Sequence, residues 1–188
     1  MAKTLLIVLV VLLIIIAVPA MMAIGIRNNM VTLDETVNNA WANVETVLQR
    51  RYDLIPNLVN TVKGYAAQEK GVLEEVTRLR SQWGEAKTVS EKAETATAME
   101  SALSRLMVVV EQYPELKSNQ NFLALQDELA GTENRISVER RRYNDAVRDY
   151  NVTIRKFPNS LFAGLFGFEK RTPFEAAAGA GTAPQVQF

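Results

Sequence analysis

The sequence predicts an all-α protein: one N-terminal transmembrane helix followed by a long antiparallel up-down helical bundle. Three observations predict this fold class. Residues 4–26 form an uncharged apolar run, and apolar residues recur at heptad spacing through residues 37–157. No alternating pattern typical of strands competes until the final few residues. Without the run and the two ends, about 130 residues remain, a normal size for one domain with one core.

The apolar run of residues 4–26 is long enough to be a membrane anchor. At about 1.5 Å of rise per residue it spans a hydrocarbon core of roughly 30 Å. Val18, Pro19 and Ala20 resemble the site of a cleaved signal peptide. Signal cores usually run about 7–15 apolar residues, however, and this run continues past that site. We therefore expect an uncleaved anchor over residues 1–27, and the basic residues on its flanks do not decide its orientation.

Two rows of residues spaced seven apart predict the first bundle helix, and Pro56 should bend it. The rows are Val37, Val44, Leu58 and Tyr65, with Arg51 in the vacant position, and Trp41, Leu48, Ile55 and Val62. A second helix carries Val72, Val76, Leu79 and Trp83; a third carries Ala96, Met99, Leu103, Leu106, Val110 and Tyr113. We expect a turn at residues 87–90 with Ser90 as the N-cap, and Pro114 should end the third helix.

The last helix has the clearest pattern, and Pro158 should stop it. Its six heptad positions are Phe122, Leu129, Ile136, Tyr143, Tyr150 and Phe157. The turn at residues 87–90 favours four helices over residues 28–158, an order that returns the chain to the membrane. If the second and third helices were one rod, the bundle would instead have three.

The C-terminal segment, residues 159–188, carries large apolar residues beyond the bundle. They are Leu161, Phe162, Leu165, Phe166 and Phe168. Three interpretations remain for them: covering the end of the core, contacting another subunit, or inserting into the membrane surface. Val186 and Phe188 alternate at the end of the tail, where a docked strand-like end is the alternative to a disordered one.

Composition removes several kinds of chemistry. Lys and Arg number 21, Asp and Glu number 21, and His and Cys are absent. Balanced charge argues against nucleic acid as a partner, and the missing residue types are the commonest general base, transition-metal ligand and disulfide former. We expect no enzymatic activity, no cofactor, no metal and no small-molecule substrate. A hydrolase that uses carboxylates is the least favoured alternative.

Arg51 occupies a core position, where a charge is costly unless it is paired. We expect an interhelical ion pair with Glu133 or Glu139 of the last helix. The alternative is an Arg that extends its charge to water at the edge of the seam.

Tyr143 with Asn144 and Tyr150 with Asn151 repeat at one heptad in the last helix. The repeat predicts a buried polar ladder that fixes packing. A ligand site between helices is the alternative interpretation.

Several clusters together resemble a known family. They comprise residues 50–59, 62–65, 111–117, 133–136, 142–147, 150–151, 154–158 and 167–168, with Glu69. They are similar to the LemA family of bacterial membrane proteins over nearly the whole chain. The resemblance implies a helical bundle behind one helix in the cell membrane, a bundle on the cytoplasmic side, and no established enzymatic activity. Some relatives are associated with forming magnetosome membranes, and Gln68 stands where relatives often carry His.

Anchor, bundle and resemblance together lead to an expected function. We expect a scaffold in the bacterial inner membrane that self-associates as a homo-oligomer and organises or shapes that membrane. A monovalent adaptor that presents the bundle to a membrane protease or signalling partner is the alternative. Self-assembly of the pure protein distinguishes the two.

Overall fold

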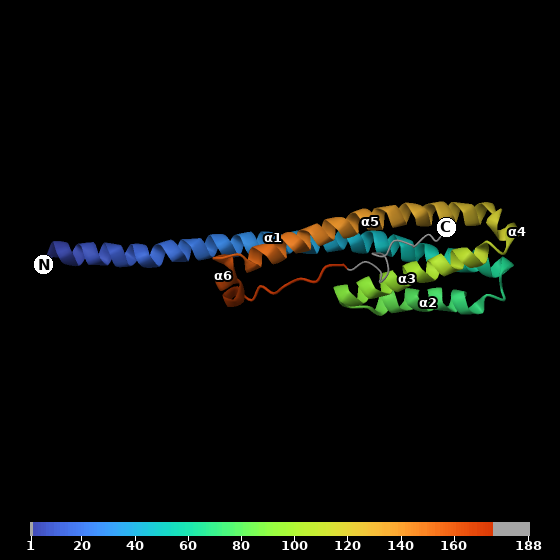
Figure 1. Cartoon of the computed structure of the whole chain (residues 1–188), viewed down its shortest axis with the longest axis horizontal. Helices are drawn as coiled ribbons and strands as arrows, with labels where there is room; N and C mark the ends of the chain where they lie inside the picture. The colour runs from blue at the N-terminus through green and yellow to red at the C-terminus, as the bar shows by residue number, and fades with distance from the viewer. Residues whose placement is uncertain (1, 175–188) are drawn as a thin grey trace, which may run out of the picture. The chain divides into compact units, whose positions relative to one another are not determined.

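The computed structural model describes residues 2–174, which form six helices and no strand (Figure 1). The helices are α1 (Ala2–Tyr65), α2 (Lys70–Glu85), α3 (Val89–Val110), α4 (Pro114–Lys117), α5 (Gln120–Arg155) and α6 (Asn159–Phe166). This confirms the all-α prediction, one long apolar N-terminal helix followed by a bundle. The tail residues Val186 and Phe188 lie outside the described residues.

The described residues divide into two units. The first comprises residues 2–40 and 143–173; the second comprises residues 41–142 and Phe174. Both α1 and α5 contribute to each unit, because each of these helices continues unbroken through the boundary.

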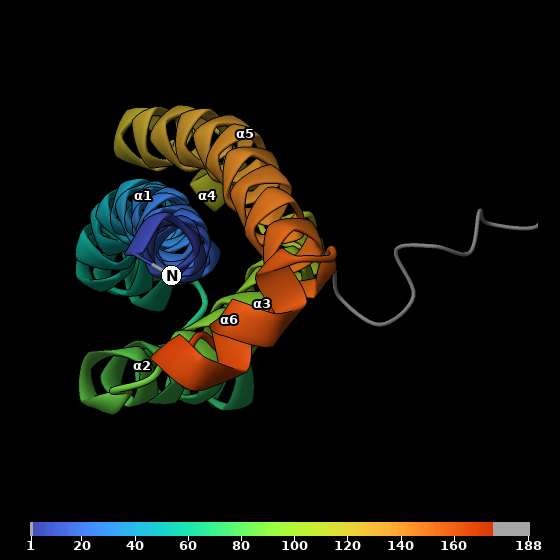
Figure 2. The same ribbon diagram turned by 90° about the vertical axis from the view of Figure 1, so that its left-hand side faces the viewer.

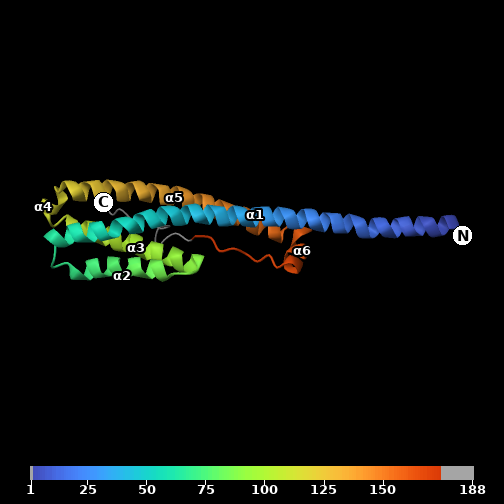
Figure 3. The same ribbon diagram turned by 180° about the vertical axis from the view of Figure 1, so that it is seen from behind.

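In the second unit, parts of α1 and α5 pack with α2 and α3 around one core, and Figures 1 and 3 both show α2 and α3 side by side. Two contacts set the direction of α1 and α5. Arg51 pairs with Glu133, and the Tyr65 hydroxyl accepts a hydrogen bond from Asn119 at 2.9 Å. Between these contacts the residue numbers rise by 14 along α1 and fall by 14 from Glu133 of α5 to Asn119, which directly precedes α5, so the helices are antiparallel over two heptads.

Most predicted heptad positions are buried in the two units, but the ends of two rows are not. Tyr65 is the last residue of α1 and is exposed. Phe157 lies beyond the end of α5 and is 82% exposed. The prediction that Tyr65 and Phe157 are buried was wrong, because each helix ends at or before that residue. Heptad periodicity alone does not show where a helix stops packing against its neighbour.

Pro56 does not interrupt α1, although it removes one backbone donor. The carbonyl that a residue at position 56 would bond within the helix is that of Tyr52. Arg80 of α2 donates its Nε–H to this carbonyl at 3.3 Å. A hydrogen bond lost within α1 is thus replaced by one between α1 and α2.

The turn between α2 and α3 is capped by Thr88, not by the predicted Ser90, which already lies inside α3. The Thr88 hydroxyl accepts from the Glu91 N–H at 3.2 Å, and the Glu91 carboxylate accepts from the Thr88 N–H at 3.0 Å. The hydrogen bond from the Lys87 N–H, followed by the bonds of this reciprocal capping box, lowers the pKa of Glu91. The helix therefore begins one residue after Thr88, earlier than the sequence pattern suggested.

Thr88→Ala should destabilise the second unit by about 1 kcal/mol, because it removes the N-cap acceptor. Ser90→Ala is the matched control: Ser90 is an exposed residue within α3, so its replacement should cost far less. Urea unfolding followed by tryptophan fluorescence measures both, since Trp41 and Trp83 both lie in this unit. Equal losses in the two variants would contradict the assignment of the cap.

Pro114 begins a helix and does not end one, contrary to the sequence-based prediction. α3 stops at Val110, and Pro114 occupies the first position of the short α4, where its missing N–H costs nothing. Asn119 then caps α5, its side-chain oxygen accepting from the Phe122 N–H at 3.1 Å.

The first unit contains the apolar part of α1. Its side chains from Leu6 to Ile16 are exposed, and an 18-residue window of this helix has none of its residues buried. This is the one helix among residues 6–174 that is long and apolar enough to cross a membrane. Packing begins at Met30, which is completely buried.

α6 ends the helical part of the first unit. Gly167 terminates it in the left-handed conformation, with φ of 74°, and the Phe168 N–H bonds back to the Ala163 carbonyl at 2.9 Å. Residues 167–173, which we call the strap, continue without helix or strand.

Candidate functional site

Arg51 and Glu133 form an ion pair inside the second unit. Arg51 is only 5% exposed, whereas the Glu133 side chain is 37% exposed. The other glutamate considered, Glu139, pairs with Arg142 one turn along α5 at 2.7 Å. The pair therefore joins α1 to α5 through Glu133, and its charge-assisted bonds fix the register of two antiparallel helices.

An aromatic stack lies beside this pair on α1 and α2. The rings of Tyr52 and Trp83 are 4.5 Å apart at 17°, and Lys92 of α3 lies 5.3 Å over Trp83 while pairing with Glu45. Burial raises the pKa of Tyr52, so its phenol stays neutral. No partner for its hydroxyl is found among the described residues.

The predicted polar residues of the last helix gather on the strap, in the first unit. Tyr143 and Tyr150 donate their hydroxyls to the carbonyls of Thr172 and Glu169, each at 2.9 Å. Asn151 donates to the Arg171 carbonyl at 2.8 Å and accepts from the Arg171 N–H at 2.9 Å. Three residues of the predicted repeat, Tyr143, Tyr150 and Asn151, thus hold a backbone segment.

An ion pair with α1 completes the attachment of the strap. The Arg171 guanidinium reaches both carboxylate oxygens of Asp34, at 3.0 and 3.1 Å. Neither residue was predicted from the sequence, because they lie 137 positions apart and neither belongs to a heptad row.

Burial raises the pKa values of Tyr143 and Tyr150, while the nearby Arg171 cation lowers them by a smaller amount. The carboxylate of Asp34 raises the pKa of Tyr150 further. Both phenols therefore remain protonated donors at neutral pH, which is what two backbone carbonyls of the strap require.

The predicted apolar interaction residues form α6 and its flank. Ala163 points inward and is buried, whereas Leu161 and Leu165 are 66% and 75% exposed. Phe162 and Phe166 stack with centroids 6.2 Å apart and are half-buried, as is Phe168. The structure brings five of the seven predicted residues together; Val186 and Phe188 are outside the part it describes.

Just after the strap, Phe174 is buried in the second unit. Its ring lies 6.2 Å from that of Trp41, and the Arg140 guanidinium lies 4.1 Å from its centroid. This aromatic anchor was not predicted, since Phe174 stands in a segment with no periodic pattern.

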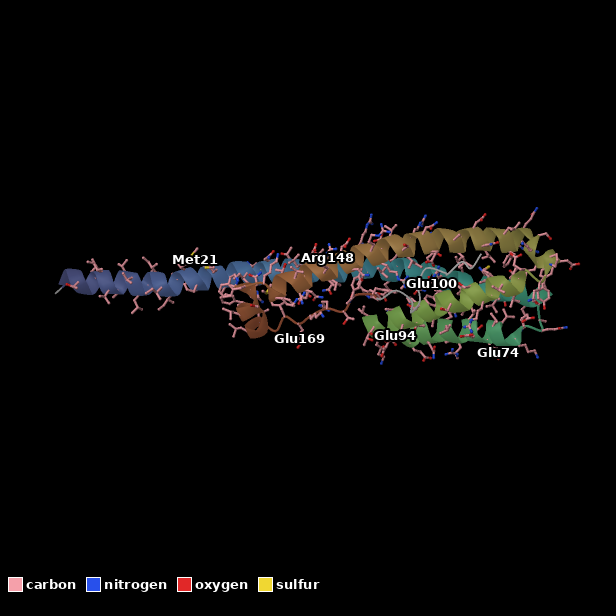
Figure 4. The ribbon with its side chains drawn as sticks, viewed as in Figure 1. Met21, Glu74, Glu94, Glu100, Arg148 and Glu169 are labelled. Atoms are coloured by element: carbon pink, nitrogen blue, oxygen red, sulfur yellow. The ribbon has the colours of Figure 1, made fainter. Side chains whose placement is uncertain are left out.

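A surface groove lies on the second unit. An open groove between α2 and α3 is lined by Gln82, Glu85, Glu91 and Glu94 among others, and Figure 4 shows Glu94 directed away from the core. Within the described residues, no group of three or more Asp and Glu side chains is arranged to hold a metal ion. The contacts described above are ring packing, hydrogen bonds and ion pairs.

A family model for the LemA family matches residues 40–188. The chain belongs to the LemA family. The matched region includes the whole described second unit, α6 and the strap; Asp34 and the apolar part of α1 precede it.

Several relatives of this LemA-family chain carry the name magnetosome protein. MamQ 2 of Paramagnetospirillum magneticum is 28% identical over 177 residues, covering 79% of this chain and 64% of that protein. MamQ of Magnetospirillum gryphiswaldense is 28% identical and covers 85% of this chain. Protein LemA of Metamycoplasma hominis is 23% identical over 82% of this chain and 71% of its own length. The chain spans 64% of the length of the first of these, and LemA and MamQ proteins are not known as enzymes.

Proposed function

We propose that this LemA-family chain is a non-enzymatic, membrane-anchored helical scaffold that self-associates and organises or shapes the bacterial inner membrane. The observation that carries the proposal is α1. Its bare apolar stretch and its packed stretch belong to one continuous helix. Because no flexible linker separates the apolar stretch from the packed stretch of this helix, a displacement of the bundle also displaces the membrane-spanning part. A scaffold requires such a connection.

The relatives support the same proposal. Two MamQ proteins are named for the magnetosome, and their similarity extends over most of this chain. The buried polar groups of both units serve packing: Arg51 joins two helices, and Tyr143, Tyr150 and Asn151 hold the strap. We assign no described residue to catalysis.

Self-association is tested with the full chain in mild detergent. Light scattering across a range of protein concentrations should give one discrete oligomer, after the detergent mass is subtracted. A monomer at every concentration would contradict the scaffold and favour the adaptor that presents its bundle to another membrane protein.

The proposal that the bundle lies on the cytoplasmic side can be tested with a single introduced Cys, because the sequence contains no other Cys. Val108 is exposed on α3, so Val108→Cys offers a single thiol on the second unit. A membrane-impermeant maleimide should label it only after cells are opened. Labelling in intact spheroplasts would place the bundle on the opposite side.

A further inference from the structure

α6 lies across α1 within the first unit. Figure 1 shows it standing crosswise to α1, and Figure 2, which looks along α1, shows it extended across the line of sight. A helix that crosses a bilayer along α1 would therefore place α6 roughly in the membrane plane. This is the orientation of an interfacial helix.

The position of α6 along α1 matches the membrane boundary. Figure 4 labels Met21 on the bare stretch, and α6 is the next part of the first unit along α1. The strap that follows α6 is tied to Asp34, eight residues past Ile26. At about 1.5 Å per residue this tie lies about 12 Å beyond the apolar run. The headgroup layer is roughly 5–8 Å thick on each side, so the tie lies just outside this layer. Figure 1 shows α6 closer than the strap to the N-terminal stretch of α1, which places α6 at the level of the headgroups.

The outer face of α6 has the chemistry of an interfacial helix. Leu161 and Leu165 lie two residues on either side of the buried Ala163, so they project from the opposite face. Neither has a described partner that would exclude water. Such exposed Leu side chains gain free energy when they enter an apolar phase.

The charges beside α6 complement an anionic surface. Arg155 and Lys156 precede the helix and Glu169 and Lys170 follow it, all four exposed. Three of the four are basic, and Lys side chains reach headgroup phosphates while their stems remain in apolar surroundings. Arg27, also exposed, is the first charge after the apolar run.

We propose that the Leu161–Leu165 face of α6 inserts into the interfacial layer of the same bilayer that α1 crosses. This face of α6 contacts lipid. The inserted helix increases the area of one leaflet beside the membrane-spanning part of α1. The inference rests on the proposed anchoring by α1 and adds a second contact between the chain and the membrane. It gives the scaffold a direct means of acting on membrane shape.

Single spin labels on the full chain test this. Leu161→Cys and Leu165→Cys place the label on the outer face of α6; Leu13→Cys places it in the apolar run, and Val108→Cys is the control, exposed to 67% like Leu161 but on α3. Each variant is reconstituted into phosphatidylethanolamine–phosphatidylglycerol vesicles. Accessibility to oxygen, which concentrates in lipid, is compared with accessibility to a water-soluble nickel chelate.

The oxygen-to-nickel ratio at positions 161 and 165 should exceed that at position 108 several-fold and approach that at position 13. A high nickel accessibility at 161 and 165, with position 13 in lipid, would overturn the inference and leave the anchor intact. Low accessibility to both reagents would also overturn it, since the face would then contact protein. A water-exposed position 13 would overturn the anchoring and the inference together.

Discussion

Glu133→Leu should lower the free energy of unfolding of the second unit by about 3 kcal/mol, because it leaves a buried guanidinium without its counter-ion. Arg51 is 5% exposed, and its Nε already lacks a partner among the described residues. Arg51→Met should cost less, about 1 kcal/mol, because the partly exposed Glu133 carboxylate can be hydrated when it loses its partner. The double variant should recover much of the loss of Glu133→Leu. Tryptophan fluorescence during urea unfolding measures all three.

Glu139→Leu is the matched control for Glu133→Leu. Both are glutamates of α5, but Glu139 pairs with Arg142 on its own helix. The Glu139 side chain is 16% exposed and its Oε2 has no hydrogen-bond partner among the described residues, while Arg142 is exposed and can be hydrated. Replacement by Leu should therefore be neutral or stabilising, and its effect should add to that of Arg51→Met. If Glu139→Leu and Arg51→Met were coupled as strongly as the Glu133 pair, the assignment of the partner would be wrong.

Asn151→Ala should release the strap, since it removes both side-chain bonds to the backbone of Arg171. Two buried hydrogen bonds correspond to about 2 kcal/mol, or roughly a 30-fold increase in local opening. The Arg171 amide loses its acceptor in this variant, so hydrogen exchange is read at the Phe168 amide of the strap, whose bond to the Ala163 carbonyl does not involve Asn151. Asn121→Ala is the control, because Asn121 is exposed on the same helix. Unchanged exchange in Asn151→Ala would show that the strap is held elsewhere.

The same strap should loosen in alkaline solution. Tyr143 and Tyr150 have raised pKa values in the folded protein. The contribution of these two phenols to stability is therefore complete below the ordinary tyrosine pKa of about 10 and is lost as the pH rises through their raised pKa values. The protection factor at the strap, which is the exchange rate corrected for intrinsic base catalysis, should fall above that range. The variant with both Tyr replaced by Phe should lack this fall in protection and have a weaker strap at neutral pH.

Periodic features were predictable from the sequence, because a buried helix face repeats with the helix. Val44, Leu58, Ile136 and Tyr150 all lie in predicted heptad rows and are buried. Arg51 stood out for the same reason, since a charge interrupted an apolar row. Periodicity did not distinguish Glu133 from Glu139, because both lie close to the seam and only the packing of α5 on α1 separates them.

Features that depend on tertiary contact were not predictable. The strap is held by side chains that bond to backbone carbonyls, and a carbonyl is present at every residue whatever its identity. Thr88 and Ser90 are both good N-cap residues, so the choice depends on which one has Glu three positions later. That signal, Thr88 with Glu91, was available in the sequence and was overlooked.

The hydrogen bond from Arg80 to the Tyr52 carbonyl has a consequence for how the bundle folds. Because Pro56 leaves that carbonyl without an intrahelical donor, α1 has one fewer backbone hydrogen bond near its C-terminal end, and the carbonyl needs another donor once it is buried. Docking of α2 supplies the donor. Local helix formation and tertiary assembly thus depend on each other at this point, which favours all-or-none folding of the second unit over stepwise addition of helices. A proline that weakens one helix in isolation here increases the cooperativity of the whole unit.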